Sequence, residues 1–163
     1  MHSARRMRRA AVASIALVLT FCAGGRGPSS TSVPGHGALS VQITPNPVVA
    51  TNVGGDPYQV PFDVIVRETA GHPVDIDRVS ANVVALGGIQ VGSDSYDAAR
   101  IRSLGFSTHV PANGELRYHF DQRRDVSNSI VFNAGVSADI RVDGHDETGT
   151  ATSATTRVSV TRG

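Results

Sequence analysis

From residue 38 onward, apolar and polar residues alternate, and this period of two is the feature that most constrains the fold. Successive side chains of a β-strand point to opposite faces, so an alternating segment buries one face and exposes the other. Apolar residues occupy every second position in three clear runs: Leu39, Val41 and Ile43; Tyr58, Val60, Phe62, Val64 and Val66; and Ile130, Phe132, Ala134, Val136, Ala138, Ile140 and Val142. The pattern predicts half-buried β-strands.

Turn-forming residues separate these runs. Pro45-Asn46-Pro47 ends the first run, residues 70–73 form a turn by composition, and Asp143–Glu147 precedes a final strand over residues 152–160. In the strand that begins at Val74, the apolar positions change parity around residues 77–78, which predicts a β-bulge. About seven short strands with frequent turn signals predict an all-β fold, an antiparallel β-sandwich.

Residues 94–105 fit two structures. Ala98, Ile101 and Leu104 are spaced three apart, as in a short helix capped by Asp94 and ended by Gly105. Alternation through Ala99, Ile101 and Ser103 fits an edge strand instead. We favour the strand, because the surrounding sequence is β throughout.

The first 22 residues have the composition of an export signal. Four arginines among residues 5–9 precede an apolar run from Ala10 to Phe21, and small residues follow Cys22. About a dozen apolar residues are too few to cross a bilayer as a helix. Residues 23–37 are rich in Gly, Ser and Pro and should form a flexible linker. The predicted organisation is therefore a signal peptide over 1–22, a linker over 23–37 and one domain over 38–163.

Three interpretations of Cys22 remain open. Leu19-Thr20-Phe21-Cys22 resembles the motif of bacterial lipoprotein signals, although Phe21 stands where that family has a small residue. The resemblance implies lipid attachment at Cys22. The alternatives are ordinary signal-peptidase cleavage between Cys22 and Gly25, or retention of the segment as an uncleaved anchor. We expect a protein of the periplasm or cell surface, whose membrane contact comes only through an anchor at Cys22.

Charge and cysteine content exclude other classes. Every basic residue is an arginine, and from Ala38 onward 10 arginines face 14 acidic residues, a net charge of about −4. A mildly acidic domain with few aromatic residues is a poor ligand for nucleic acid. Because Cys22 is the only cysteine, the domain must be stable without disulfides.

Two segments resemble bacterial immunoglobulin-like domains of exported and surface proteins. Residues 137–161 are similar to their last hairpin, with a β-branched strand, an Asp-rich tip and a Thr/Ala-rich return strand, and residues 62–71 resemble an early strand. The resemblance implies an immunoglobulin-like sandwich without the cysteines and tryptophan of antibody domains. It carries no catalytic signature, and such sandwiches serve many functions.

Candidate sites are few. Asp143, Asp146 and Glu147 cluster near the predicted last turn and are the candidate ligands for Ca²⁺, the metal that the sequence favours over zinc or copper. Arg100, Arg102 and Arg117 are candidates for binding an anion. Asp75 and Asp77 share one face of a strand, and we expect an arginine, Arg78 or one on a neighbouring strand, to pair with them.

No motif for nucleophilic catalysis or zinc binding is present in the sequence. We therefore expect a non-catalytic module that binds a protein or glycan of the envelope or the extracellular space, or that serves a structural role there. One alternative is a secreted protease inhibitor that acts through the loop at residues 105–114. The other is an enzyme whose site assembles from His109, His119 and Asp121.

Overall fold

The structure is a computed structural model, and it describes residues 28–55, 57–125 and 135–163. These residues form ten strands, one short α-helix and one 3-10 turn. In chain order the elements are β1 (Ser29–Thr31), β2 (Leu39–Thr44), β3 (Val48–Asn52), β4 (Pro57–Glu68), β5 (Val74–Ala85), η1 (Leu86–Gly88), β6 (Gln90–Asp97), α1 (Ala98–Ser103), β7 (His109–Val110), β8 (Glu115–Asp125), β9 (Val136–Asp146) and β10 (Ala151–Arg162). The all-β class is confirmed, with more strands than the seven expected.

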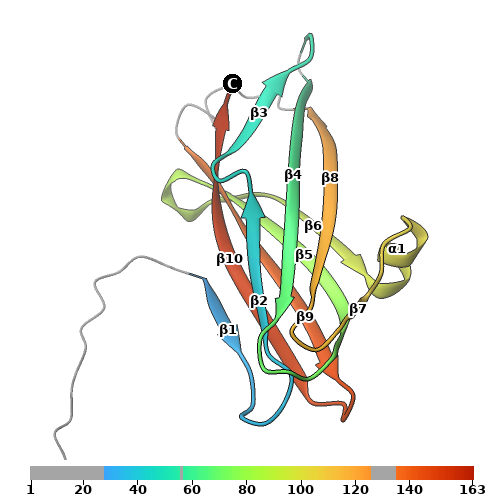
Figure 1. Cartoon of the computed structure of the whole chain (residues 1–163). Coiled ribbons are helices and arrows are strands. Elements are labelled where there is room, and N and C mark those ends of the chain that lie inside the picture. Colours follow the sequence, from blue (N-terminus) through green and yellow to red (C-terminus); the bar gives the residue numbers. More distant parts are fainter. Residues whose placement is uncertain (1–27, 56, 126–134) are drawn as a thin grey trace, which may run out of the picture.

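The strands lie in two layers (Figure 1). In the front sheet, β4 pairs with β8 on one side and with β2 and β3 on the other. In the back sheet, β10, β9, β5 and β6 are antiparallel neighbours in that order, and β1 and β7 add short pairs to β10 and β5. β3 joins the layers, because it also pairs with the end of β10, in parallel. The expectation of purely antiparallel pairing was wrong at this strand.

The core fills the space between the sheets and comes from the predicted alternation. Leu39, Val41 and Ile43 of β2 are buried, and β9 buries every second residue from Val136 to Asp146. Five aromatic residues extend this core, with ring centroids 5.4–6.5 Å apart: Phe62, Tyr96, Phe106, Tyr118 and Phe120. The predicted core positions 130, 132 and 134 lie outside the described residues.

The predicted bulge in β5 is confirmed, whereas the predicted last turn was misplaced. Pairing between β5 and β9 shifts register between Ile76 and Arg78, so Asp77 is the extra residue. β9 continues through Asp143 and Gly144 and ends only at Asp146. Gly144 serves a close approach between strands instead of a turn, because a Cβ there would lie 2.6 Å from the Asp75 carbonyl oxygen.

Residues 94–105 contain both predicted structures in succession. β6 continues to Asp97, and α1 then covers Ala98–Ser103, so the preference for a strand was wrong for these six residues. The helix is capped by Asp97, one turn after the Asp94 expected, and the Asp97 carboxylate accepts a 2.7 Å hydrogen bond from the Arg100 amide. Ile101 turns inward and is buried. Among the described residues, no helix is long and apolar enough to cross a membrane.

The described part of the predicted linker belongs to the fold. Ser29–Thr31 form β1, which pairs with residues 153–155 of β10, and the Thr152 hydroxyl donates to the Thr31 carbonyl. The domain therefore begins before Ala38. A Gly/Ser/Pro-rich composition predicted flexibility here, but an open edge of β10 supplies backbone partners that composition does not reveal.

Candidate binding surface

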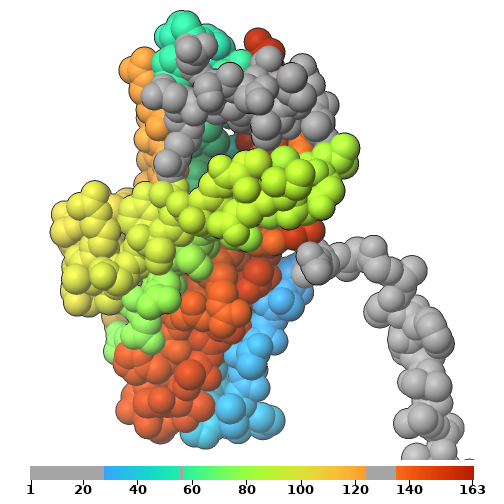
Figure 2. Space-filling view, turned by 180° about the vertical axis from the view of Figure 1, so that it is seen from behind, coloured from blue at the N-terminus to red at the C-terminus, as the bar shows by residue number. Residues whose placement is uncertain are grey.

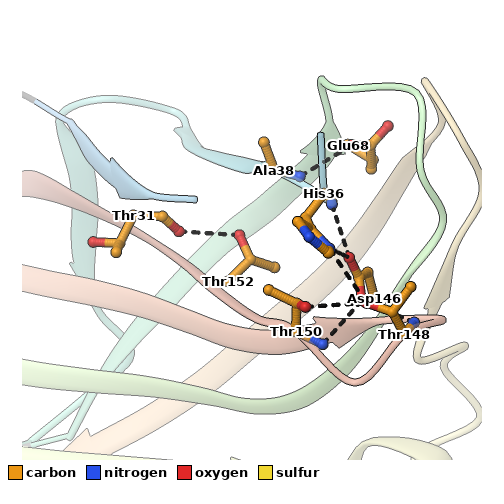
Figure 3. Close-up of polar contacts among 9 residues, drawn as sticks. Thr31, His36, Ala38, Glu68, Asp146, Thr148, Thr150 and Thr152 are labelled. Carbon is orange, nitrogen blue, oxygen red and sulfur yellow. Dashed lines mark hydrogen bonds and ion pairs between the residues drawn. The ribbon is translucent and has the colours of Figure 1, made fainter. Parts of the chain in front are cut away.

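Asp146 forms hydrogen bonds with His36 and Gly37, in the segment that leads into β2. The residue is only 3% exposed. Oδ1 accepts from the Thr148 amide and hydroxyl and from the Thr150 amide, at 2.6–2.9 Å. Oδ2 is bonded to His36 Nδ1 at 2.9 Å and accepts from the Gly37 amide at 3.2 Å (Figure 3). The hydrogen bond from Thr148 is the largest cause that lowers the pKa of Asp146, against the opposing effect of burial.

Glu68 fastens the next residue of the same segment. It is 3% exposed, and its carboxylate accepts from the backbone amides of Ala38, Ala70, Gly71 and Asn113 at 2.7–3.2 Å. Burial raises the pKa of Glu68, but these four N–H donors outweigh it and lower the pKa to about 2. Both buried carboxylates therefore hold loops together at one end of the sandwich.

The candidate calcium ligands do not converge. Asp146 is occupied by the donors above, Asp143 pairs with Arg141 at 2.7 Å, and Glu147 is exposed on the turn. Within the described residues, no group of three or more His, Cys, Asp or Glu side chains could hold a metal ion. In the structure Asp146 accepts hydrogen bonds within the turn, and Asp143 forms an ion pair.

The candidate anion-binding arginines lie on separate elements. Arg100 and Arg102 are on α1, whereas Arg117 is on β8. Arg117 pairs with Asp63 at 3.2 Å and lies 3.9 Å from Glu115. The structure therefore does not assemble the three into one site, and Cys22, the candidate for lipidation, lies outside the described residues.

The histidines of the alternative enzyme site lie on different sheets, and the loop of the alternative protease inhibitor is anchored to the core. His109 pairs with Asp75 on the back sheet, while His119 pairs with Asp63 on the front sheet. In the loop at residues 105–114, Phe106 packs edge-on against Tyr118, at 5.6 Å between centroids. The loop is thus fixed to the core through its largest side chain.

Histidines, and not arginines, are the partners of the paired aspartates on β5. His109 Nδ1 lies 2.9 Å from Asp75, and His145 Nδ1 lies 2.9 Å from Asp77. The hydrogen bond to Asp77 is the main cause that raises the pKa of His145. The expectation of an arginine partner was wrong, because β7 and β9 bring these histidines opposite Asp75.

The outer face of the back sheet carries a shallow groove that is largely open to solvent. Its volume is about 510 Å³. The lining comes from four neighbouring strands: Ser80, Ala81, Asn82, Gln90, Ser93, Asp94, Ser95, Asp139, Arg141 and Thr155. The strand register explains this gathering, because two transverse rows cross the sheet: Ser95, Ser80, Arg141 and Thr155, and beside them Ser93, Asn82, Asp139 and Arg157.

Two charged groups of the groove, Asp139 and Arg141, are held in ion pairs, whereas one amide oxygen has no hydrogen-bond partner among the described residues. Arg157 binds Asp139 through two hydrogen bonds of 2.6 Å, and Arg141 binds Asp143. The Asn82 Oδ1 atom is buried and has no hydrogen-bond partner among the described residues. Buried acceptors are normally satisfied, so this oxygen is an exception to the general pattern.

The groove reaches the edge of the sheet. β6 pairs with β5 on one side, and in the described part of the chain no strand pairs with its other side. It is eight residues long and mostly exposed, without lysine or proline to block pairing. The candidate surface therefore combines hydrogen-bonding side chains with an open strand edge.

Comparisons with known proteins bear on the fold alone. No protein-family model matches the sequence, and no curated protein matches it. Among solved structures, 28 chains are similar, including the X-ray structure of Northeast Structural Genomics Consortium target SoR45. That chain shares 9% identity and a TM-score of 0.53, with 79% of this chain and 90% of that chain covered.

The sequence analysis did not predict the groove, although the alternation pattern contained part of the information. Alternation places the Ser, Asn and Asp residues of β5 and β9 on the outer face. What alternation does not contain is the register between strands distant in sequence, which sets Ser80 beside Arg141 and Asn82 beside Asp139.

Proposed function

We propose that this chain is a non-catalytic, immunoglobulin-like module of the bacterial envelope. It is exported, tethered through Cys22, and binds an extended protein segment on the outer face of its back sheet. The observation that carries the binding role is the shallow groove, lined mostly by residues with hydrogen-bonding side chains, beside the open edge of β6.

The strand connectivity supports the immunoglobulin-like type. Immunoglobulin sandwiches divide their strands into an ABE(D) sheet and a CFG sheet. Here β2, β4 and β8 take the places of A, B and E, and β5, β9 and β10 take those of C, F and G. β6 then corresponds to the extra strand beside C.

The uses of the polar side chains support a non-catalytic role. The carboxylate oxygens of Glu68 and Asp146, the two buried acids, accept hydrogen bonds from backbone amides and, at Asp146, from a hydroxyl of the turn. Four histidines are each paired with a different aspartate: His36, His109, His119 and His145. A nucleophile, base and acid in one cleft are what catalysis of acyl transfer would need.

An extended protein segment suits the surface better than a glycan. An open strand edge offers main-chain hydrogen bonds to a further strand, and adjacent side-chain groups give selectivity. The groove is lined by hydroxyl, amide, carboxylate and guanidinium groups, with no aromatic ring in its lining.

Site-specific photo-crosslinking in the protein's own host tests the binding role. A photoreactive residue at Ser95, in the groove, should give a discrete protein adduct, and Ser80→Arg in the same chain should abolish it by filling the groove. The matched control places the photoreactive residue at Gln42, exposed on the front sheet. Equal adducts at both positions, or none at Ser95, would contradict the proposal.

A further inference from the structure

The tip of the β5–β6 hairpin exposes large apolar side chains. Leu86 is 71% exposed, Ile89 66% and Val91 46%. No charged residue lies between Arg78 and Asp94. Figure 2 shows this hairpin, in lime, projecting past the body of the domain. Within the described residues these three side chains remain exposed, and an exposed apolar surface of this kind is a candidate contact site.

β1 begins at its end nearer to this hairpin. One row of paired residues crosses the strands β1, β10, β9 and β5, and it consists of Ser29, Thr155, Arg141 and Ser80. β1 runs antiparallel to β10, so Ser29 is the residue of β1 nearest to Val160. β5 runs toward the hairpin in the direction in which β10 runs toward Val160. In both views, β1 and the hairpin tip lie on the same side of the molecule (Figures 1 and 2).

The length of chain before β1 matches this separation. Ser29 and Ser80 lie in one row across the back sheet. The hairpin begins five residues beyond Ser80 along β5, which is about 17 Å. In the other direction, β5 lies three strand spacings from β1, which is about 14 Å. Seven residue steps join Cys22 to Ser29, which in extended form reach roughly 25 Å. Because β1 is paired with β10, the tether consists only of the residues between Cys22 and Ser29, and it is shorter than a free linker over residues 23–37 would be. A lipid on Cys22 and the hairpin tip can therefore occupy one plane.

We propose that the hairpin tip, residues 86–91, is a membrane-contact element that inserts Leu86 and Ile89 into the interface of the bilayer holding the Cys22 lipid. This inference rests on the proposed tether. Apolar burial supplies the attraction, since the tip carries no charge and the domain is net acidic. In this orientation the groove would face along the membrane plane, toward neighbouring envelope proteins.

A single tryptophan reports the contact cleanly, because the chain has none. Ile89→Trp and the control Leu104→Trp, which is 43% exposed at the end of α1, are each prepared in the full chain purified from host membranes. Both are reconstituted into phosphatidylcholine vesicles with and without brominated acyl chains. We expect a shift to shorter wavelength and loss of emission for Ile89→Trp, and neither change for Leu104→Trp.

The outcomes separate this inference from the tether. An acylated chain whose Ile89→Trp emission is unquenched, or quenched no more than that of Leu104→Trp, overturns the membrane contact and leaves the tether standing. That result would point to a protein partner for the tip. If intact mass shows no acyl group, the tether fails, and the same variants are added to vesicles as soluble chains. Quenching restricted to Ile89→Trp then supports the contact by itself, and its absence overturns it.

Discussion

At the scale of single residues, the Glu68 carboxylate joins three segments of chain that are distant in sequence. It receives amides from the start of β2, from the turn after β4 and from the loop before β8. An amide side chain in its place could accept only through one oxygen, and its NH₂ group would face N–H donors. The position therefore tolerates no neutral isostere without loss of hydrogen bonds.

Glu68→Gln should lower the free energy of unfolding at pH 7 by on the order of 2 kcal/mol. The pKa of Glu68 falls from 4.5 to about 2 on folding, so its contribution is complete above pH 4.5 and is lost as pH falls through 2. Denaturant unfolding at pH 7 and at pH 2 measures the difference between variant and parent. The difference should shrink at pH 2.

The control for this prediction is Glu115→Gln, which removes an exposed partner of Arg67 and should cost less than about 1 kcal/mol. A Glu68→Gln variant as stable as its parent at pH 7 would contradict the assigned role of the carboxylate. So would a loss of the same size at both pH values.

At the scale of elements, the Asp146 carboxylate holds His36 and Gly37 in the segment that joins β1 to β2. Asp146→Asn keeps one oxygen, which can serve either the turn at residues 148–150 or the pair His36 and Gly37, but not both. Backbone amides of residues 29–37 should therefore exchange with solvent about tenfold faster or more in this variant. Hydrogen–deuterium exchange measures this directly.

Asp143→Asn is the matched control, since Asp143 pairs with Arg141 on the outer face and does not touch residues 29–37. Exchange over residues 29–37 should remain at the parental rate in that variant. Unchanged exchange in Asp146→Asn, or an equal rise in both variants, would mean that the carboxylate does not hold the segment.

Elements were predictable from the sequence wherever one local pattern decided them. The alternation in β2 and β9 and the parity change at Asp77 identified strands and a bulge, because a half-buried strand must place apolar residues on one face. The Asp143-Gly144 pair misled, since glycine also permits close approach between strands, and only the position of the Asp75 backbone shows which use applies. α1 was ambiguous because six residues make too short a helical pattern.

At the scale of the whole molecule, composition and alternation determined the all-β class but not the pairing of distant strands. The parallel pair between β3 and β10, and the addition of β1 to the edge of β10, depend on which edges remain open after the hairpins form. The groove has the same origin. Its residues lie on four strands between positions 80 and 155, and only their register gathers them.

The central claim, a tethered envelope module, is tested most directly by the intact mass of the mature protein from its own host, with membranes and medium analysed separately. We predict a membrane-bound species that begins at Cys22 and carries the added mass of acyl chains. A soluble species that begins between Ala23 and Arg26, without modification, would contradict the claim.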